Sequence, residues 1–144
     1  MVATLNKRAT HDIVSKGLEA LRNLEHRGAS GAEVNSGDGA GILVQIPDEF
    51  FRKTVEFQLP VRGSYAAGIV FLPKDFAARK RLKENRLEEI AEEEGLKILG
   101  WRELPINSSN LGATALSVMP HFEQLFVSAI DGSSDLDQIG RAHV

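Results

Sequence analysis

Apolar residues recur every three or four positions near the start of the chain, over residues 11–24. An α-helix turns once in about 3.6 residues, so this spacing gathers them into one stripe on a helix. Thr10 or Asp12 supplies a cap at its start, and Gly28 and Gly31 follow closely enough to end it near Glu25. The pattern therefore predicts an amphipathic helix. Its stripe consists of Ile13, Val14, Gly17, Leu18, Leu21 and Leu24.

Four later apolar runs predict strands. Residues 40–47 are almost continuously apolar and end at Pro47, as expected of a buried strand. Residues 64–72 and 96–104 predict two more strands, and residues 121–130 predict the fourth. Two sets of side chains alternate along the fourth strand: Phe122, Gln124 and Phe126 on one face, and Glu123, Leu125 and Val127 on the other.

Helices are predicted between these strands. Residues 48–55 read as a short amphipathic helix, and residues 109–120 as a loop with one helical turn. The longest helix covers residues 75–94 and ends at Gly95, a residue common after helix C-termini. Its charges run basic first and acidic last, against the helix dipole, and we interpret them as a solvated face. Its inner side is expected to carry Phe76, Leu82, Leu87, Ile90 and Ala91. Strands mixed with helices indicate an α/β or α+β domain.

Composition excludes several classes of protein. The 144 residues are 42% hydrophobic and 26% charged, which is typical of a globular domain. The net charge of −3 and the absence of a basic patch argue against nucleic-acid binding. No apolar run is long enough to span a membrane, and the first residues lack a secretory signal. Because the chain contains no cysteine, it offers no disulfide and no thiolate metal site, and we expect a cytoplasmic protein.

Glycines concentrate in the segment "SGDGAGI", residues 36–42, which raises the question of a phosphate loop. A dinucleotide fingerprint follows a strand and opens a helix, whereas Gly37, Gly39 and Gly41 follow a loop and precede a predicted strand. Nucleotide binding is therefore the weaker reading, and a turn that leads into a strand is the stronger one. The histidines are scattered without metal-ligand spacing, and no G-x-S-x-G elbow occurs, so we expect no metal site and no serine hydrolase.

The segment "LEHRG", residues 24–28, places Arg27 directly after the first predicted helix and beside glycines. An arginine can hold a carboxylate with two parallel hydrogen bonds, and glycines let a ligand approach the backbone. A surface ion pair is the other interpretation, and these residues alone leave both open.

The end of the chain differs from the rest. The segment "IGRAHV" resembles the translation of a widely used sequencing adapter. We therefore expect Ile139 to Val144 to be a non-native tail and residues 1–138 to be part of one domain, with the chain a partial reading of a longer gene.

The segment "THDIVSKGLEALRNLEHRGASGAEVNSGDGAGILVQIPDEFF" resembles the start of class II glutamine amidotransferase domains, in particular that of glutamate synthase large subunits. Four later segments resemble that family in the same order: "GSYAAGIVFLP", "EEEGLKILGWRELP", "NSSNLGATA" and "MPHFEQLFV". The resemblance covers about residues 2–130. It implies an N-terminal-nucleophile hydrolase fold, an αββα sandwich of which only part is present here.

The resemblance also implies a mechanism and a site. In this family an N-terminal cysteine attacks the glutamine side-chain amide, forms a thioester and releases ammonia. Arg27 matches the family arginine that binds the glutamine α-carboxylate, and His26 and Gly28 belong to the same motif. The family pattern begins Cys-Gly-Val-Gly-Phe-Val, and Met1 stands where its phenylalanine would be, so the nucleophile is expected upstream of Met1. We therefore expect no catalytic residue in this chain and no glutaminase activity from it.

Further partners and cofactors are implied for the parent enzyme only. Its ammonia would pass to 2-oxoglutarate and yield glutamate, with FMN and an iron–sulfur cluster outside this chain. Its electrons would come through a small NAD(P)H-oxidising subunit or from ferredoxin. The alternative is a free-standing, non-catalytic module that binds glutamine or regulates a partner. An isolated fragment would also expose apolar strand surfaces and tend to associate.

Overall fold

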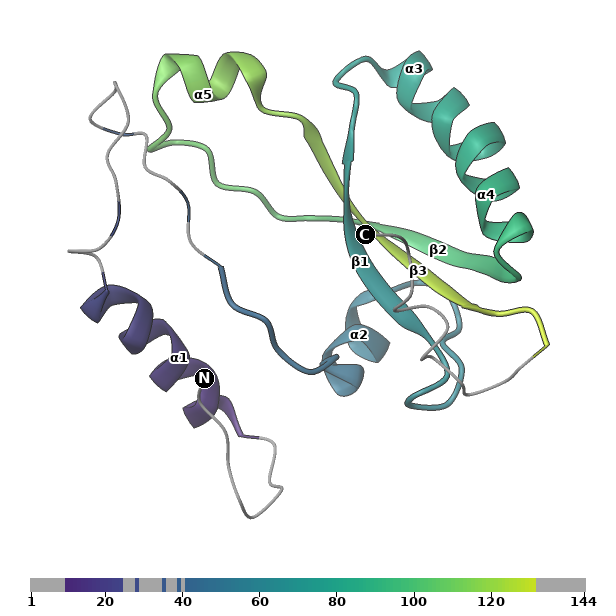
Figure 1. Cartoon of the computed structure of the whole chain (residues 1–144), viewed down its shortest axis with the longest axis horizontal. Helices are drawn as coiled ribbons and strands as arrows, with labels where there is room; N and C mark the ends of the chain where they lie inside the picture. The colour runs from purple at the N-terminus through teal and green to yellow at the C-terminus, as the bar shows by residue number, and fades with distance from the viewer. Residues whose placement is uncertain (1–9, 25–27, 29–34, 36–38, 40, 132–144) are drawn as a thin grey trace. The chain divides into compact units, whose positions relative to one another are not determined.

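The computed structural model describes residues 10–24, 28, 35, 39 and 41–131 (Figure 1). Its contacts divide the chain into two compact units. The first holds the described residues up to Gln45 together with Asn107–Met119, and the second holds Ile46–Ile106 and the described residues from Pro120. The predicted boundaries at residues 138 and 139 lie outside the described part and stay a prediction.

Two helices make up the regular structure of the first unit. Helix α1, His11–Asn23, confirms the predicted amphipathic helix, and Leu24 closes it by donating its N–H to the Ala20 carbonyl at 3.2 Å. Helix α5, Ala113–Val118, occupies the segment where a loop with one helical turn was expected. Neither helix contains a buried residue.

The strand predicted over residues 40–47 is wrong for the part that the structure describes. Residues 41–47 have no secondary structure, and Leu43 is fully exposed. A continuously apolar strand needs neighbouring strands and cover on both faces, and no described strand pairs with this segment. The segment is apolar, as the sequence shows, but an apolar segment forms a strand only where a neighbouring strand pairs with it.

The second unit is built on a three-stranded antiparallel sheet of order β1-β3-β2. These strands confirm three of the four predicted ones: β1 Ala66–Leu72, β2 Leu96–Glu103 and β3 His121–Ala129. The antiparallel pairing, together with the helices, makes the chain an α+β protein.

Helical segments flank the sheet. Helix α2, Asp48–Thr54, precedes β1, and a long helix joins β1 to β2. The long helix confirms the one predicted over 75–94, but it is not uniform. It consists of α3 Phe76–Arg81, a π-helical stretch η2 Leu82–Leu87, and α4 Glu88–Glu93. Asp75 caps its start by accepting a hydrogen bond from the Ala78 N–H at 2.7 Å, and Gly95 follows its end at φ +70°.

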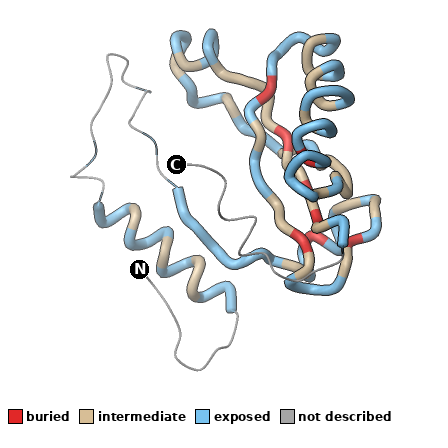
Figure 2. Tube along the Cα trace, turned by 45° about the vertical axis from the view of Figure 1, so that its right-hand side comes forward, coloured by how far each residue is buried: buried red, intermediate tan, exposed pale blue. Residues whose placement is uncertain are grey.

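All buried residues of the described chain lie in the second unit (Figure 2). All but Ala91, which lies on α4, belong to the sheet or to the segment that leads into it. The core centres on Phe126 of β3, which has no exposed surface. The rings of Phe51, Phe57 and Tyr65 surround it at centroid distances of 5.0, 5.3 and 6.3 Å. A Cβ at Gly100 of β2 would lie 2.7 Å from Cγ of Phe57, so a side chain there would displace the Phe57 ring.

A polar network anchors α2 beside this core. Tyr65, 1% exposed, donates its hydroxyl to Oδ1 of Asp48 at 2.9 Å, and Nε of Arg52 donates to Oδ2 at 2.9 Å. Arg52 also donates to the carbonyls of Leu59 and Pro60. The hydrogen bond from Arg52 lowers the pKa of Asp48. Burial, reinforced by the hydrogen bond to Asp48, raises the pKa of Tyr65 to about 12.

The shifted pKa of Tyr65 predicts a loss of stability at high pH. The folded-state pKa lies above the ordinary value near 10, so above pH 10 the unfolded state loses the phenolic proton first. The free energy of unfolding should therefore fall as the pH rises from about 10 towards 12. Urea denaturation at several pH values measures this fall.

The control is Tyr65→Phe, which has no group to titrate. It should lose about 1 kcal/mol at neutral pH with the hydroxyl's hydrogen bond. Its remaining pH dependence above pH 10 should be clearly weaker than that of the unsubstituted chain. Parallel losses of stability in the two proteins would contradict the role given to Tyr65.

Candidate functional site

The predicted glutamine-binding residues lie at the boundary of the described chain. Arg27 and His26 fall outside the described residues, and Gly28 is described and exposed. Helix α1 ends at Asn23, so the predicted helix end before this motif is confirmed. The arrangement of the three residues around a substrate stays a prediction.

The glycine-rich segment is described at Gly39 and from Gly41 onward. Gly39 has φ +78°, a conformation that side chains other than glycine rarely adopt. A Cβ at Gly39 would meet no atom within 4 Å. The glycine is therefore explained by its backbone conformation and not by a close neighbour. Residues 41–47 form neither a helix nor a strand, so the expectation that the glycine turn leads into a strand is wrong for the described residues.

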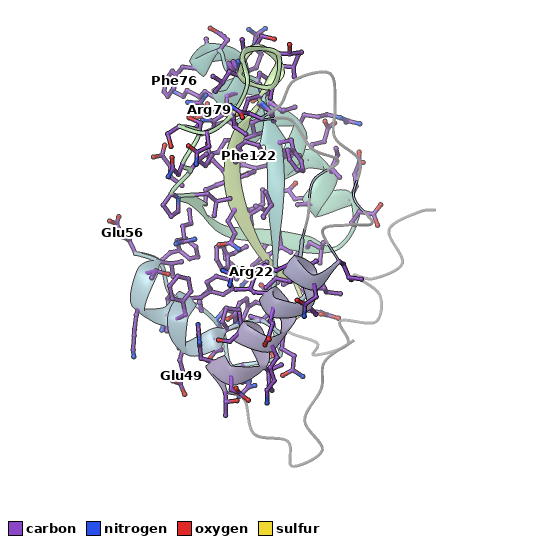
Figure 3. All side chains as sticks on the ribbon, turned by 90° about the vertical axis from the view of Figure 1, so that its left-hand side faces the viewer. Arg22, Glu49, Glu56, Phe76, Arg79 and Phe122 are labelled. Atoms are coloured by element: carbon purple, nitrogen blue, oxygen red, sulfur yellow. The ribbon has the colours of Figure 1, made fainter. Side chains whose placement is uncertain are left out.

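The second unit contains a groove that the sequence did not predict. It has a volume of about 400 Å³ and lies between the α3–η2 helix and the sheet. In Figure 3, Phe76 and Arg79 lie at the end of the sheet that carries Phe122. The groove is lined by Phe76, Arg79, Lys80, Lys83, Glu84, Trp101, Glu103 and Glu123.

Glu123 of β3 is the buried centre of this groove, at 5% exposure. Lys83 donates a hydrogen bond from Nζ to Oε2 of Glu123. Nε of Arg79 lies 3.5 Å from Oε1, and Nε2 of His121 lies 3.2 Å from the same oxygen. Lys83 also lies over the Trp101 ring, 4.4 Å from its centroid. One buried carboxylate therefore contacts two cations of the helix, Arg79 and Lys83, and the histidine of its own strand.

The π-helical stretch explains how the helix meets the sheet. Arg79, Lys83, Leu87 and Ala91 are spaced by four residues and are all at least partly buried. In a regular α-helix three such steps turn the direction by about 120° beyond whole turns. A π-helix has wider turns because its hydrogen bonds join residues five apart. The wider turns of η2 bring these residues back towards one line facing the sheet.

The interpretation of this helix as a solvated charged face is therefore only partly right. Arg79 and Lys83 turn inward to Glu123, whereas the Lys80–Glu84 and Arg86–Glu89 pairs are exposed. Two residues expected on the inner side are also exposed: Phe76 at 69% and Ile90 at 37%. The constant spacing of four residues from Arg79 to Ala91 is consistent with the wider turn of η2. The usual search for apolar residues three or four apart does not detect it, because two of these four residues are charged.

The chemistry of the groove is that of an ion-pair cluster. Glu103 pairs in register with Glu123 across β2 and β3, and like charges in opposite positions destabilise a sheet. The lining holds three cations and three carboxylates, so it has no charge preference for an anionic ligand. None of the lining residues is a serine, threonine or cysteine. We conclude that the cluster fixes the helix on the sheet.

The described residues contain no group of three or more histidine, aspartate or glutamate side chains able to hold a metal ion. In the described part of the chain, no helix has the length and apolar character that a bilayer span requires.

Glu123→Gln tests the ion-pair cluster. Removing the carboxylate leaves Arg79 and Lys83, whose side chains are 14% and 23% exposed, without their counter-charge. Breaking a buried ion pair on one side is strongly destabilising, so we expect a loss of about 3 kcal/mol in the free energy of unfolding. Urea denaturation measures this loss.

Glu89→Gln is the matched control. The side chains of Glu89 and of its partner Arg86 are both more than half exposed. The free energy of unfolding should therefore change by less than about 0.5 kcal/mol. Similar losses in the two variants would show that Glu123 is no anchor.

Comparisons with known proteins agree with the sequence pattern. The chain matches the family model "Glutamine amidotransferases class-II" over residues 1–142. It is 42% identical over 137 residues to the "Glutamate synthase (NADPH) large chain" of Bacillus subtilis (strain 168), covering 94% of this chain and 9% of that protein. It is 40% identical over 132 residues to "Ferredoxin-dependent glutamate synthase 2, chloroplastic" of Arabidopsis thaliana, covering 90% of this chain and 8% of that protein. "Ferredoxin-dependent glutamate synthase 2" of Synechocystis is 37% identical over 143 residues, which covers 97% of this chain and 9% of that protein. The chain thus spans less than a tenth of the length of these relatives.

Proposed function

Because the chain belongs to the class II glutamine amidotransferases, we propose that it forms part of the glutaminase domain of a glutamate synthase large subunit. The observation that carries this proposal is the similarity to glutamate synthases from three organisms over at least 90% of the chain. In the parent enzyme this domain would hydrolyse the side-chain amide of glutamine. The ammonia would pass to a second site, where it would be combined with 2-oxoglutarate.

Arg27 is proposed as the clamp for the glutamine α-carboxylate. It follows α1 by a few residues, so the helix fixes the start of the segment that carries it. A guanidinium presents two parallel N–H groups to a carboxylate, which gives direction as well as charge. His26 and Gly28 would shape the same pocket, with Gly28 leaving the backbone open to the substrate.

The chain itself is proposed to be inactive. The reaction needs a thiolate nucleophile, with an adjacent base to take up its proton. The sequence contains no cysteine, and the thioether of Met1 neither ionises nor attacks an amide. The binding residues and the nucleophile would therefore belong to different parts of a longer protein.

An iron–sulfur cluster, one of the cofactors expected of the parent enzyme, does not fit this chain. Iron–sulfur clusters are held mainly by cysteine thiolates, and the chain has none. The partner that supplies electrons differs between the relatives, since one is named for NADPH and others for ferredoxin. The electron donor is therefore left outside this proposal, and the chain's own role is confined to glutamine.

The fold of the second unit supports a place in a layered αββα sandwich. The long helix lies on the sheet face that carries Glu123. The opposite face carries the Phe126 core at one end, and Ile69 and Phe71 are 57% and 67% exposed on the same face. A sheet with one helical face and one partly uncovered apolar face is what one half of such a sandwich would present.

A free-standing, non-catalytic glutamine-binding module is the second candidate, because binding glutamine through Arg27 requires no cysteine. The DNA directly upstream of Met1 distinguishes the two. In-frame codons for Cys-Gly-Val-Gly support the enzyme fragment, whereas an in-frame stop codon followed by a ribosome-binding site supports the free-standing module.

Glutamine binding tests Arg27. In calorimetry on the purified chain, Arg27→Lys should weaken glutamine binding at least about tenfold, because lysine cannot form the paired hydrogen bonds. Arg22→Lys, on the exposed side of α1, is the matched control and should bind as the unsubstituted chain does. Equal affinity in all three proteins would remove Arg27 from the site.

Ammonia release tests the missing nucleophile. The pure chain should release no ammonia from glutamine above the rate in buffer, at any pH between 6 and 9. A coupled glutamate dehydrogenase assay measures the product. Turnover that survives further purification and persists in Arg22→Lys would refute the proposed inactivity.

A further inference from the structure

The two edges of the sheet differ in a way that the proposed function does not explain. Among the described residues, β1 and β2 each pair only with β3, so each leaves one row of backbone N–H and C=O groups without a neighbouring strand. Natural proteins protect such edges with charges, prolines or bulges. The β2 edge has these protections: it carries Lys97, Arg102 and Glu103 and a register shift between Ile98 and Gly100.

The β1 edge has none of them. Its seven residues, AAGIVFL, contain no charged or polar side chain and no proline, and they pair with β3 without a register shift. A shallow apolar hollow of about 270 Å³ runs along Ala66–Val70, with Leu125 and Val127 of β3 beside it. Ile69 and Phe71 are the most exposed large hydrophobic side chains of the sheet. Short, uncharged segments of this composition readily add a further strand.

We propose that β1 pairs antiparallel with β1 of a second copy of this chain, centred on Ile69. The sequence is complementary to itself in this register. Ala66 faces Leu72 of the second copy, Ala67 faces Phe71, Gly68 faces Val70, and Ile69 faces Ile69. Every small residue of one strand is thus opposite a large residue of the other.

The complementarity holds on both faces of the sheet. Opposite residues in an antiparallel pair lie on the same face, and residues two apart share a face. The face of the Phe126 core gains the Phe71–Ala67 and Ile69–Ile69 contacts. The helical face gains the Leu72–Ala66 and Val70–Gly68 contacts. A shift of two residues in one direction sets Val70 against Val70 and leaves both alanines outside the pairing. A shift in the other direction sets Gly68 against Gly68 and leaves Phe71 and Leu72 outside it, so only the register centred on Ile69 pairs all seven residues.

The proposed pairing has closed twofold symmetry, and it creates no new unprotected strand edge. The contact is the same on both copies, so the two three-stranded sheets become one sheet of twice that width around a twofold axis. Among the described strands, the edges left are the two β2 strands, which carry the charges and the bulge. No charge of β1 opposes the approach, because the strand has none.

Cross-linking tests the register directly, because the chain contains no cysteine of its own. Directly opposite residues have Cα atoms about 4.5–5.5 Å apart, which suits a disulfide. Ile69→Cys should therefore form a covalent dimer under mild oxidation at least about tenfold faster than Val61→Cys, an exposed control outside the strand. A mixture of Gly68→Cys and Val70→Cys should give mainly the mixed dimer. Equal rates at residues 69 and 61 would overturn the register.

Sedimentation tests the association without a cross-link. The unsubstituted chain should show a concentration-dependent dimer, and Ile69→Lys, which places a charge at the centre of the edge, should be monomeric with an unchanged circular-dichroism spectrum. Phe76→Lys, at a similarly exposed apolar residue outside β1, should still dimerise. A monomeric unsubstituted chain overturns the proposal and assigns the edge to a strand of a different chain segment. A dimer that persists in Ile69→Lys, or one that is lost equally in Phe76→Lys, overturns it as well.

Discussion

The packing of three aromatic rings around Phe126 is the contact on which the second unit depends. It joins α2 through Phe51, the segment before β1 through Phe57 and Tyr65, and the central strand itself. Phe57 fits only because β2 has no side chain at Gly100. The core is small, so the loss of any one ring would remove a large part of the apolar surface that folding buries. The Tyr65–Asp48–Arg52 network attaches α2 to the segment before β1 a second time.

The other face of β3 is held by a different kind of interaction. Glu123 lies on the face opposite to Phe126, and it holds the long helix through ion pairs with Arg79 and Lys83. Apolar contact alone specifies weakly where along a strand a helix sits, because sliding by one turn exchanges similar contacts. A buried carboxylate that must meet Arg79 and Lys83 permits one position only. We infer that the buried pair contributes specificity of packing more than net stability, since burying the charges costs much of what the pairing returns.

Local patterns predicted most of the elements, and long-range contacts account for what they missed. The three strands, α1, α2 and the long helix follow from the period of apolar residues within each segment. The strand over residues 40–47 was wrong in the described part because a strand exists only with a neighbour, and a run of apolar residues does not name one. Glu123 was read as one more residue in an alternating strand, since its partners lie about 40 residues away on the long helix. Arg27 became a site candidate through family resemblance, because periodicity gives no role to a single arginine after a helix.

The edge strands β1 and β2 also restrict which strands can be added to this sheet, whether the added strand comes from the same chain or from another one. A strand added at β2 would have to accommodate a bulge and the charges of Lys97 and Arg102. A strand added at β1 meets an even register and no charge. Its side chains must complement those of β1 in size: large opposite Ala66, Ala67 and Gly68, and small opposite Val70, Phe71 and Leu72. The second copy of β1 satisfies this requirement, and any strand of a longer protein that took its place would have to satisfy it too, so the sequence of β1 is a template for its own neighbour.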